Sequence, residues 1–312
     1  MDELKVFSGN AHPALSKAIT DYLGIPLGNC EVMQFTNENT FVRILENVRE
    51  RDIFIVQPIS SPVNSHLMEL LIMIDAMKRA SAKRITAVMP YYAYGRSDKK
   101  DQPRVPITAR LIADLLTVAG ANRLLTVDLH KAQIQGFFNI PVDELTAFYL
   151  LSDYFKGKKL KNLVVVAMDF GITKQARDIA ARMDTPLAIM EKRRIGNEDR
   201  TETQTVIGDV KGKVALIVDE EINTGSSLVG VVDALMERGA REVHVCATHA
   251  VFSGPAVKRI AESQVKEVVV TDTVPVPSEK RIDKITVLPI APLLGEAIRR
   301  IHSGQSVGAM FE

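Results

Sequence analysis

Short apolar runs alternate with longer amphipathic stretches along the whole chain, and this alternation is the strongest constraint on its fold. The predicted strands are Asp52–Gln57, Arg84–Met89, Arg123–Val127, Leu163–Ala167, Val214–Val218, Glu242–Ala247 and Glu267–Val270. The predicted helices include His66–Arg79, Thr108–Ala119, Thr173–Met183 and Ser227–Arg238. Continuous apolar strands between amphipathic helices are typical of parallel sheets covered on both faces. The sequence therefore predicts an α/β fold with central parallel sheets.

The chain is long enough for two domains, and an internal repeat supports that division. With 312 residues it can build two ordinary cores. The segments 52–86 and 214–244 both follow the order strand, polar loop, helix, strand. This order indicates two similar domains, although any two βαβ units share it. We expect domains at residues 1–146 and 147–312, with the final helix, Ala291–His302, belonging to either.

Composition excludes several classes of protein. The net charge of +1, the absence of Trp and the 5% of aromatic residues argue against a nucleic-acid partner. No apolar run reaches the roughly 18 residues of a membrane span, and no secretory signal is recognisable. Cys30 and Cys246 fit small core residues rather than a disulfide. We expect a cytoplasmic protein with neither a nucleic-acid nor a membrane partner.

The strongest chemical signal is the loop that follows Val214–Val218. Asp219 and Glu220 can accept hydrogen bonds from two vicinal hydroxyls at the end of a strand. The run 224–227 (TGSS) then opens a helix, where free N–H groups and the helix dipole attract a phosphate. The loop predicts a cradle for a pentose 5-phosphate; the alternative is an acidic turn followed by an ordinary Ser N-cap. It is not a nucleotide P-loop, because no Gly-Lys-Ser/Thr follows.

Four further motifs carry polar groups suited to phosphate chemistry. His130 and Asp169 each follow a strand; the His can ligate a metal or hold a triphosphate, and the Asp places a further carboxylate at a strand end. The charged run 191–194 (EKRR) and the basic segment 94–104 supply cations. Taken singly, each has a structural alternative: a hydrogen-bonded His, a turn Asp, a solvated charge run or an inert loop. Together they fit phosphoryl-type transfer, which needs positioned phosphates, a divalent metal and converging cations.

Many stretches of the chain resemble one enzyme family. The most specific is Val127–Asp143 (VDLHKAQIQGFFNIPVD), joined by Val105–Ala109, Lys192–Arg194 and Phe252–Pro255. Over essentially its whole length the chain resembles the ribose-phosphate diphosphokinases, also called phosphoribosyl pyrophosphate synthetases. The resemblance implies two phosphoribosyltransferase-type, Rossmann-like domains and conversion of ATP and ribose 5-phosphate to AMP and phosphoribosyl pyrophosphate with Mg²⁺. It also implies a homo-oligomer, a hexamer or another dimer-based assembly, in which a neighbouring subunit lends a loop to each active site.

The resemblance also implies roles for individual residues. The catalytic cations would be Lys192 and Arg194, and the metal would be held by His130 and Asp169. The nucleotide would be bound by Phe35, Asn37, Asn39, Arg96, Ser97 and His130. Ribose 5-phosphate would be bound by Asp219, Glu220, Asn223, Thr224, Gly225, Ser226 and Ser227. A regulatory phosphate or nucleoside diphosphate would lie near Arg49, Ser81 and Ser306.

Several positions depart from the family pattern, among them Ser97 in place of the usual Gln after Arg96. Asn37 and Asn39 replace the acidic residues usual in the adenine-reading loop, and Gln175 replaces an Arg. Glu220 and Asn223 replace two aspartates of the sugar loop. We favour an active diphosphokinase that uses ATP or another nucleoside triphosphate. The alternatives are a low-activity or non-catalytic regulatory partner of an active synthetase and, less favoured, a phosphoribosyltransferase acting on a base.

Overall fold

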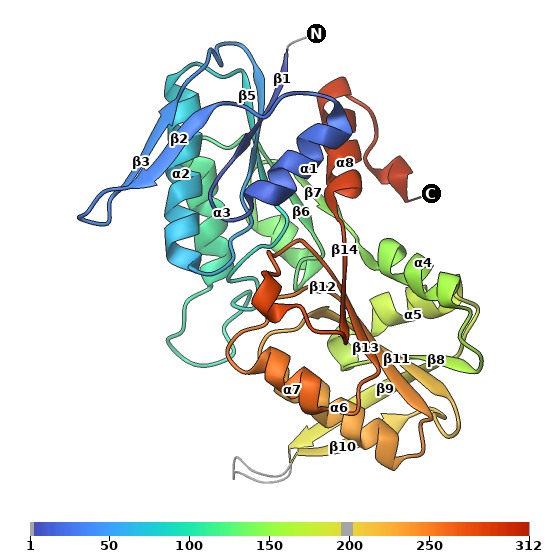
Figure 1. Ribbon diagram of the computed structural model, residues 1–312. Helices are drawn as coiled ribbons and strands as arrows, with labels where there is room; N and C mark the ends of the chain where they lie inside the picture. The colour runs from blue at the N-terminus through green and yellow to red at the C-terminus, as the bar shows by residue number, and fades with distance from the viewer. Residues whose placement is uncertain (1–2, 195–201, 312) are drawn as a thin grey trace. The chain divides into compact units, whose positions relative to one another are not determined.

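The chain divides into two compact units. The computed structural model describes residues 3–194 and 202–311, without the side chains of 192–194 and 202–204. Unit 1 comprises Met1–Thr146, Thr273–Pro275 and Pro289–Glu312, and unit 2 comprises Ala147–Asp272 and Val276–Leu288. Each unit is built around its own central sheet (Figure 1).

Unit 1 contains a five-stranded sheet in which every pair of neighbouring strands is parallel. Its strands, in spatial order, are β1 (Leu4–Ser8), β4 (Asp52–Val56), β5 (Arg84–Met89), β6 (Arg123–Val127) and β7 (Val142–Leu145). On one face α2 (Val63–Arg79) and α3 (Thr108–Ala119) bury a core that includes Ile53, Ile55 and Met89. On the other lie α1 (Pro13–Leu23) and α8 (Ala291–Ser303), which pack on each other (Figure 1).

The final helix belongs to unit 1. The Asp52 carboxylate accepts two hydrogen bonds from Arg84 and lies 2.8 Å from His302 Nδ1. The Arg84 guanidinium also donates to the carbonyl of Ile301 at 3.1 Å. These contacts join the carboxyl end of α8 to the first residues of β4 and β5.

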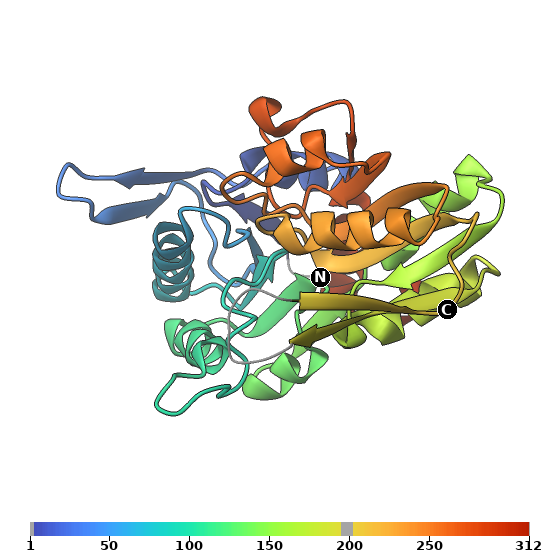
Figure 2. The same cartoon turned by 90° about the horizontal axis from the view of Figure 1, so that it is seen from below.

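An antiparallel hairpin, β2 (Cys30–Gln34) and β3 (Thr40–Ile44), extends from unit 1. Its tip reaches beyond the neighbouring helix α2 in both views (Figures 1 and 2). The Asn10 side chain donates to the carbonyl of Val32 at 3.1 Å, and Asn29 N donates to Glu46 Oε1 at 2.6 Å. The sequence did not predict this hairpin, because polar residues interrupt the short apolar pattern of both strands.

Unit 2 contains a seven-stranded sheet. Its strands, in spatial order, are β10 (Glu202–Ile207), β9 (Leu187–Arg194), β8 (Leu163–Ala167), β11 (Val214–Glu221), β12 (Glu242–His249), β13 (Glu267–Thr271) and β14 (Ile285–Leu288). Only the β9–β10 pairing is antiparallel. Two helices pack on each face: α4 (Phe148–Lys158) and α5 (Thr173–Arg182) on one, α6 (Ser226–Glu237) and α7 (Ala256–Glu262) on the other.

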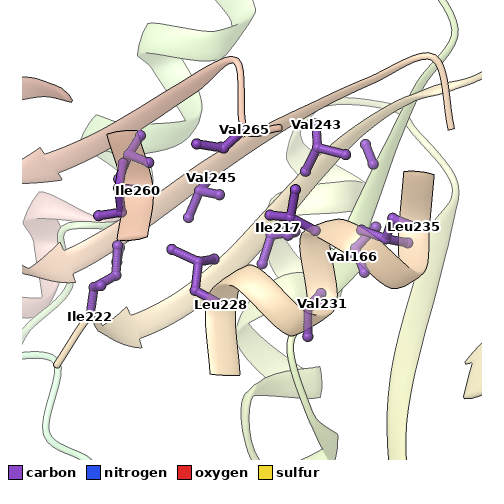
Figure 3. Close-up of a cluster of buried hydrophobic side chains, with 14 of the residues drawn as sticks. Val166, Ile217, Ile222, Leu228, Val231, Leu235, Val243, Val245, Ile260 and Val265 are labelled. Atoms are coloured by element: carbon purple, nitrogen blue, oxygen red, sulfur yellow. The ribbon is translucent and has the colours of Figure 1, made fainter. Parts of the chain in front are cut away.

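Alternate residues of each central strand serve the two faces. Leu216 and Val218 belong to the core beneath α4 and α5, and Ile217 belongs to the core beneath α6 (Figure 3). All three side chains are fully buried, which is why the strand reads as an uninterrupted apolar run. The predicted fold class, α/β with central parallel sheets, is confirmed.

The direction in which the chain adds strands reverses only in unit 2. From β8 the chain crosses through α5 to β9 on one side, then resumes with β11 on the other side of β8. Strands in the sheet of unit 1 follow one direction from β1 to β7. In open α/β sheets, ligands bind beyond the carboxyl ends of strands at such a reversal. The loops after β8 and β11 are therefore the expected ligand site of unit 2.

Candidate functional site

The acidic residues of the predicted cradle lie within β11 rather than after it. The sequence suggested that the strand ends at Val218, but Asp219 pairs with Ala247 and Glu221 with His249 of β12. The other neighbour, β8, stops at Ala167, opposite Val218. The last residues of β11 are thus paired on one side only, and their side chains lie at the reversal point of the sheet.

Asp219 is a buried carboxyl in a negatively charged surrounding. It is 9% exposed, and its Oδ1 accepts a hydrogen bond from the backbone N–H of Glu220 at 2.9 Å. Burial raises its pKa well above the usual value, and the charges of Glu220 and Asp169 raise it further. The structure therefore brings together three carboxyl groups that come from the ends of β8 and β11. Such a cluster favours a ligand that donates hydrogen bonds or carries positive charge.

Asp169 follows β8 and has a local structural role as well. Its Oδ1 accepts from the N–H of Gly171 at 2.6 Å, at the start of the short 3₁₀ turn Phe170–Ile172 that precedes α5. The carboxyl is nevertheless exposed. Asp169 is therefore a turn residue, as the structural alternative predicted. Its exposed carboxyl group remains accessible to a ligand.

The N–H groups of residues 223–227 are not used by the protein, whereas the Ile222 N–H donates to the carbonyl of His249 at 3.0 Å. The carbonyls of Ile222, Asn223 and Thr224 accept hydrogen bonds from Phe252 N (2.9 Å), Ser253 N (3.0 Å) and Arg259 Nη1 (2.8 Å). In a trans peptide the N–H points opposite to the carbonyl, so the following N–H groups face outward. Within residues 3–194 and 202–311, no acceptor is hydrogen-bonded to the N–H groups of 223–227. Helices normally leave their first N–H groups unbonded; here the row extends back to Asn223.

The alternative of an ordinary Ser N-cap is wrong. The N-cap of α6 is Gly225, at φ 73°, and no side chain caps the helix. The hydroxyls of Thr224 and Ser226 lie 3.3 Å apart, and both residues are exposed, as is Ser227. Unbonded N–H groups, exposed hydroxyls and the amino end of a helix are features that favour anion binding.

The hydrophobic core fixes both ends of this loop. Ile222 and Leu228, each 3% exposed, are buried in the same cluster as Ile260 (Figure 3). Between them, Asn223 Oδ1 is buried without a hydrogen-bond donor among the described residues. An unsatisfied buried acceptor is unusual and suits a site that a ligand hydroxyl completes.

The predicted nucleotide residues of unit 1 fall into two places. A Cβ placed on Gly95 would lie 3.5 Å from Cβ of His130, so the half-buried imidazole adjoins the segment with the exposed Arg96 and with Ser97. This group lies where β6 ends. The second place is the tip of the β2–β3 hairpin.

The tip of the hairpin presents an aromatic ring and two amides. Phe35 is 47% exposed and its ring centroid lies 5.5 Å from that of Phe41. Asn37 Oδ1 accepts from the N–H of Asn39 at 3.2 Å, which closes the turn. The Asn37 amide therefore accepts one hydrogen bond within the loop, and the residue is exposed.

The remaining predicted residues are only partly located. Lys192 and Arg194 belong to the backbone of β9, but their side chains lie outside the described residues. Arg49 donates to Ser81 Oγ at 3.3 Å, so these two regulatory candidates are neighbours. Ser306 hydrogen-bonds Ala309 and Arg300 instead.

Sequence reasoning missed Arg259, whose guanidinium on α7 hydrogen-bonds the carbonyl of Thr224 in this loop. No local pattern marks it, because the segment 256–262 (AVKRIAE) has the composition of any short surface helix.

A parallel sheet with a reversal point, a carboxyl pair and an anion-binding loop define the class as a phosphoribosyltransferase-type α/β protein. Two family models match: the N-terminal domain of ribose phosphate pyrophosphokinase over residues 4–120, and the phosphoribosyl synthetase-associated domain over residues 197–312.

Curated relatives match over nearly the full length. The ribose-phosphate pyrophosphokinase of Caldanaerobacter subterraneus subsp. tengcongensis is 51% identical over 99% of this chain and 98% of its own. That of Bacillus subtilis is 47% identical over 99% of this chain and 97% of its own. The crystal structure of phosphoribosylpyrophosphate synthetase from Mycobacterium smegmatis has a TM-score of 0.93 at 44% identity, covering 97% of this chain and 100% of that one. The chain belongs to the ribose-phosphate pyrophosphokinase family, and the predicted enzyme class is confirmed.

Proposed function

We propose that this enzyme transfers the β,γ-diphosphate of ATP, or of another nucleoside triphosphate, to the 1-hydroxyl of ribose 5-phosphate. The observation that carries the proposal is the row of unbonded N–H groups at 223–227 beside Asp219 and Glu220. The 5-phosphate would accept from these N–H groups and from the hydroxyls of Thr224, Ser226 and Ser227. The vicinal ribose hydroxyls would donate to the two carboxyl groups, which leaves the 1-hydroxyl for reaction.

The acidic end of unit 2 fits a magnesium ion held jointly with substrate. Asp169 raises the pKa of Asp219, so the three carboxyl groups share a negative field that a divalent cation would relieve. Among the described residues no group of three or more His, Cys, Asp or Glu could hold a metal alone. Mg²⁺ typically binds through one or two carboxylates together with waters and phosphates, which suits Asp169 in unit 2. His130 in unit 1 is proposed separately as a metal ligand, on the family resemblance. When bound, it would neutralise charge on the transferred diphosphate.

The other predicted residues would bind and activate the nucleotide. Arg96, Ser97 and His130 would hold its phosphates, and Phe35 would contact the base from the hairpin of a neighbouring subunit. Asn37 and Asn39 would read the base edge; because the Asn37 acceptor is used internally, a base acceptor suits this position better than an exocyclic amine. Lys192 and Arg194 would stabilise the charge that develops during diphosphoryl transfer.

The assembly proposed is a homo-oligomer. Leu111, Leu115 and Val118, at i, i+4 and i+7 on α3, are 53%, 37% and 76% exposed. A contiguous apolar stripe on a helix that already buries its other face supports a subunit contact. Arg49 and Ser81, with Ser306, would form a separate regulatory anion site.

A cytoplasmic location is also proposed. Both Cys30 and Cys246 are free thiols, which fits a reducing compartment. No helix within the described part of the chain is long and apolar enough to cross a membrane.

The test is an AMP-release assay with Mg²⁺, ribose 5-phosphate and a panel of nucleoside triphosphates. We expect phosphoribosyl pyrophosphate from at least one nucleotide, and loss of the signal in Lys192→Ala. If no nucleotide gives product above that control, the catalytic proposal fails. Mixing the chain with an active relative would then show whether it is a regulatory partner instead.

A further inference from the structure

We propose that Arg259 is a positioning residue for the sugar-phosphate loop: its guanidinium fixes the backbone orientation that presents the N–H groups of 223–227. The inference rests on the proposed function, since it assigns a role in binding ribose 5-phosphate. Arg259 lies on α7, outside the loop and outside every motif recognised in the sequence.

We call Phe252–Arg259 the clamp segment. It donates hydrogen bonds to three consecutive carbonyls of the loop. Backbone N–H groups of Phe252 and Ser253 bind the first two, and the Arg259 side chain binds the third, that of Thr224, at 2.8 Å. The last of these peptides therefore depends on a side chain for its orientation. Its N–H, that of Gly225, lies in the middle of the unbonded row and at the start of α6.

Gly225 also lies close to the first residue of α7. A Cβ on Gly225 would lie 3.4 Å from the carbonyl oxygen of Ala256, so the loop already lies close against the start of α7. The Arg259 hydrogen bond opposes movement of the loop away from α7. Phe252 adopts φ 45°, a strained value for a bulky residue, within the same clamp segment. Strain of this kind persists where surrounding structure holds a functional conformation.

The charge of Arg259 is not consumed by a carboxylate. Across residues 3–194 and 202–311, no Asp or Glu lies within ion-pairing distance of its guanidinium. The side chain is only partly exposed, so its positive charge also favours an anion at the adjacent loop. Its neighbour Lys258 is exposed and directed to Glu262, 3.9 Å away, without contact to the loop. Lys258 is therefore a matched control for removing one positive charge from the same helix.

The experiment compares the steady-state kinetics of Arg259→Gln, Arg259→Lys and Lys258→Gln. A hydrogen bond from a charged donor is worth enough that its loss should raise the KM for ribose 5-phosphate about 10- to 100-fold in Arg259→Gln. The KM for the nucleotide should change less than about twofold. Arg259→Lys, which keeps the charge but not the planar fork, should recover part of the loss. Lys258→Gln should match the wild type.

The inference is overturned if Arg259→Gln and Lys258→Gln show the same KM for ribose 5-phosphate, or if both substrates are affected equally. If Arg259→Gln does not fold, Arg259→Lys decides alone, and an unchanged KM for ribose 5-phosphate would overturn the proposal. Failure of the proposed function is a separate outcome, since the wild type itself would then be inactive with every nucleotide.

Discussion

Two strand–loop–helix connections, one in each unit, have the same order of elements but opposite chemistry. In unit 1, β4 leads into α2; in unit 2, β11 leads into α6. Both strands are central and buried, and both helices begin without a side-chain cap. Only the second connection follows the reversal point of its sheet.

The unit 1 connection pairs most of its polar side chains internally, although Ser60 Oγ is buried without a hydrogen-bond partner among the described residues. The buried Gln57 donates to Glu69 Oε1 at 2.6 Å and to the carbonyl of His66 at 3.3 Å, and it accepts from Ala11 N at 3.0 Å. Glu69 accepts further bonds from the Asn10 side chain and backbone. Pro58 and Pro62 interrupt the row of backbone donors, because proline has no N–H.

The unit 2 connection leaves its polar groups for a ligand. After the apolar run of its strand it has the carboxyl groups of Asp219 and Glu220, where unit 1 has Gln57. It has no proline between 219 and 227, and its hydroxyl residues 224, 226 and 227 are exposed. The two connections therefore differ in how many of their polar groups stay without a protein partner and in whether the strand order reverses beside them.

The largest expected effect comes from Asp219→Asn, which removes one carboxyl and keeps the acceptor for Glu220 N. We expect kcat/KM to fall about 10²- to 10³-fold, as for loss of a charge-stabilising contact at a reacting centre. Steady-state assays would measure it. Activity within a factor of a few of wild type would mean that unit 2 does not use this carboxyl for the sugar.

The matching change in unit 1, Gln57→Ala, should affect stability instead. It leaves Ala11 N and part of Glu69 without a partner in a buried place, so the free energy of unfolding should drop by about 1–3 kcal/mol. Denaturant titration gives this value, and the KM for ribose 5-phosphate should stay unchanged. A large rise in that KM would contradict the expectation that only the unit 2 connection takes part in binding ribose 5-phosphate.

Gly225→Ala should produce a smaller loss, confined to the sugar site. The left-handed φ of 73° costs an L-residue roughly 1–2 kcal/mol, so we expect the KM for ribose 5-phosphate to rise about 5- to 30-fold. Gly212→Ala is the control, since Gly212 has φ 69° and open space around it but precedes β11, at the opposite end of that strand from the loop. Equal kinetic effects of both changes would contradict the expectation.

The smallest effect is a pH dependence of stability. The folded-state pKa of Asp219 is raised above its unfolded value of about 3.9, so between these values the folded state keeps a proton that the unfolded state has lost. The wild type therefore loses stability as pH rises through this window, and Asp219→Asn does not. Thermal unfolding without Mg²⁺ should show a Tm advantage of the variant that grows with pH.

The control for this experiment is Asp209→Asn, where the sign is reversed. The Lys213 ammonium holds the pKa of the exposed Asp209 below its usual value, so its stabilising effect is present at neutral pH and is lost as pH falls. A Tm difference for Asp219→Asn that does not vary with pH would show that the carboxyl is not disfavoured by its surroundings.

The sequence alone determined the central architecture. Strands buried on both faces are continuous apolar runs, so β5, β6 and β8 were predicted with their observed ends. α3 was also predicted with its observed ends, since its apolar periodicity is complete. The acidic and hydroxyl residues of the sugar loop were likewise visible as a local pattern, and the family followed from extended identity.

The interactions between residues far apart in the chain became visible in the three-dimensional structure alone. That Asp169 acts on Asp219, that Arg84 and Asp52 hold α8 to unit 1, and that Arg259 holds Thr224 all depend on residues far apart in the chain. Local periodicity records which face of an element is buried, whereas such pairings are selected by packing of the whole unit. The acidic and hydroxyl residues of this loop could therefore be recognised in the sequence, but the Arg259 side chain that hydrogen-bonds the loop could not.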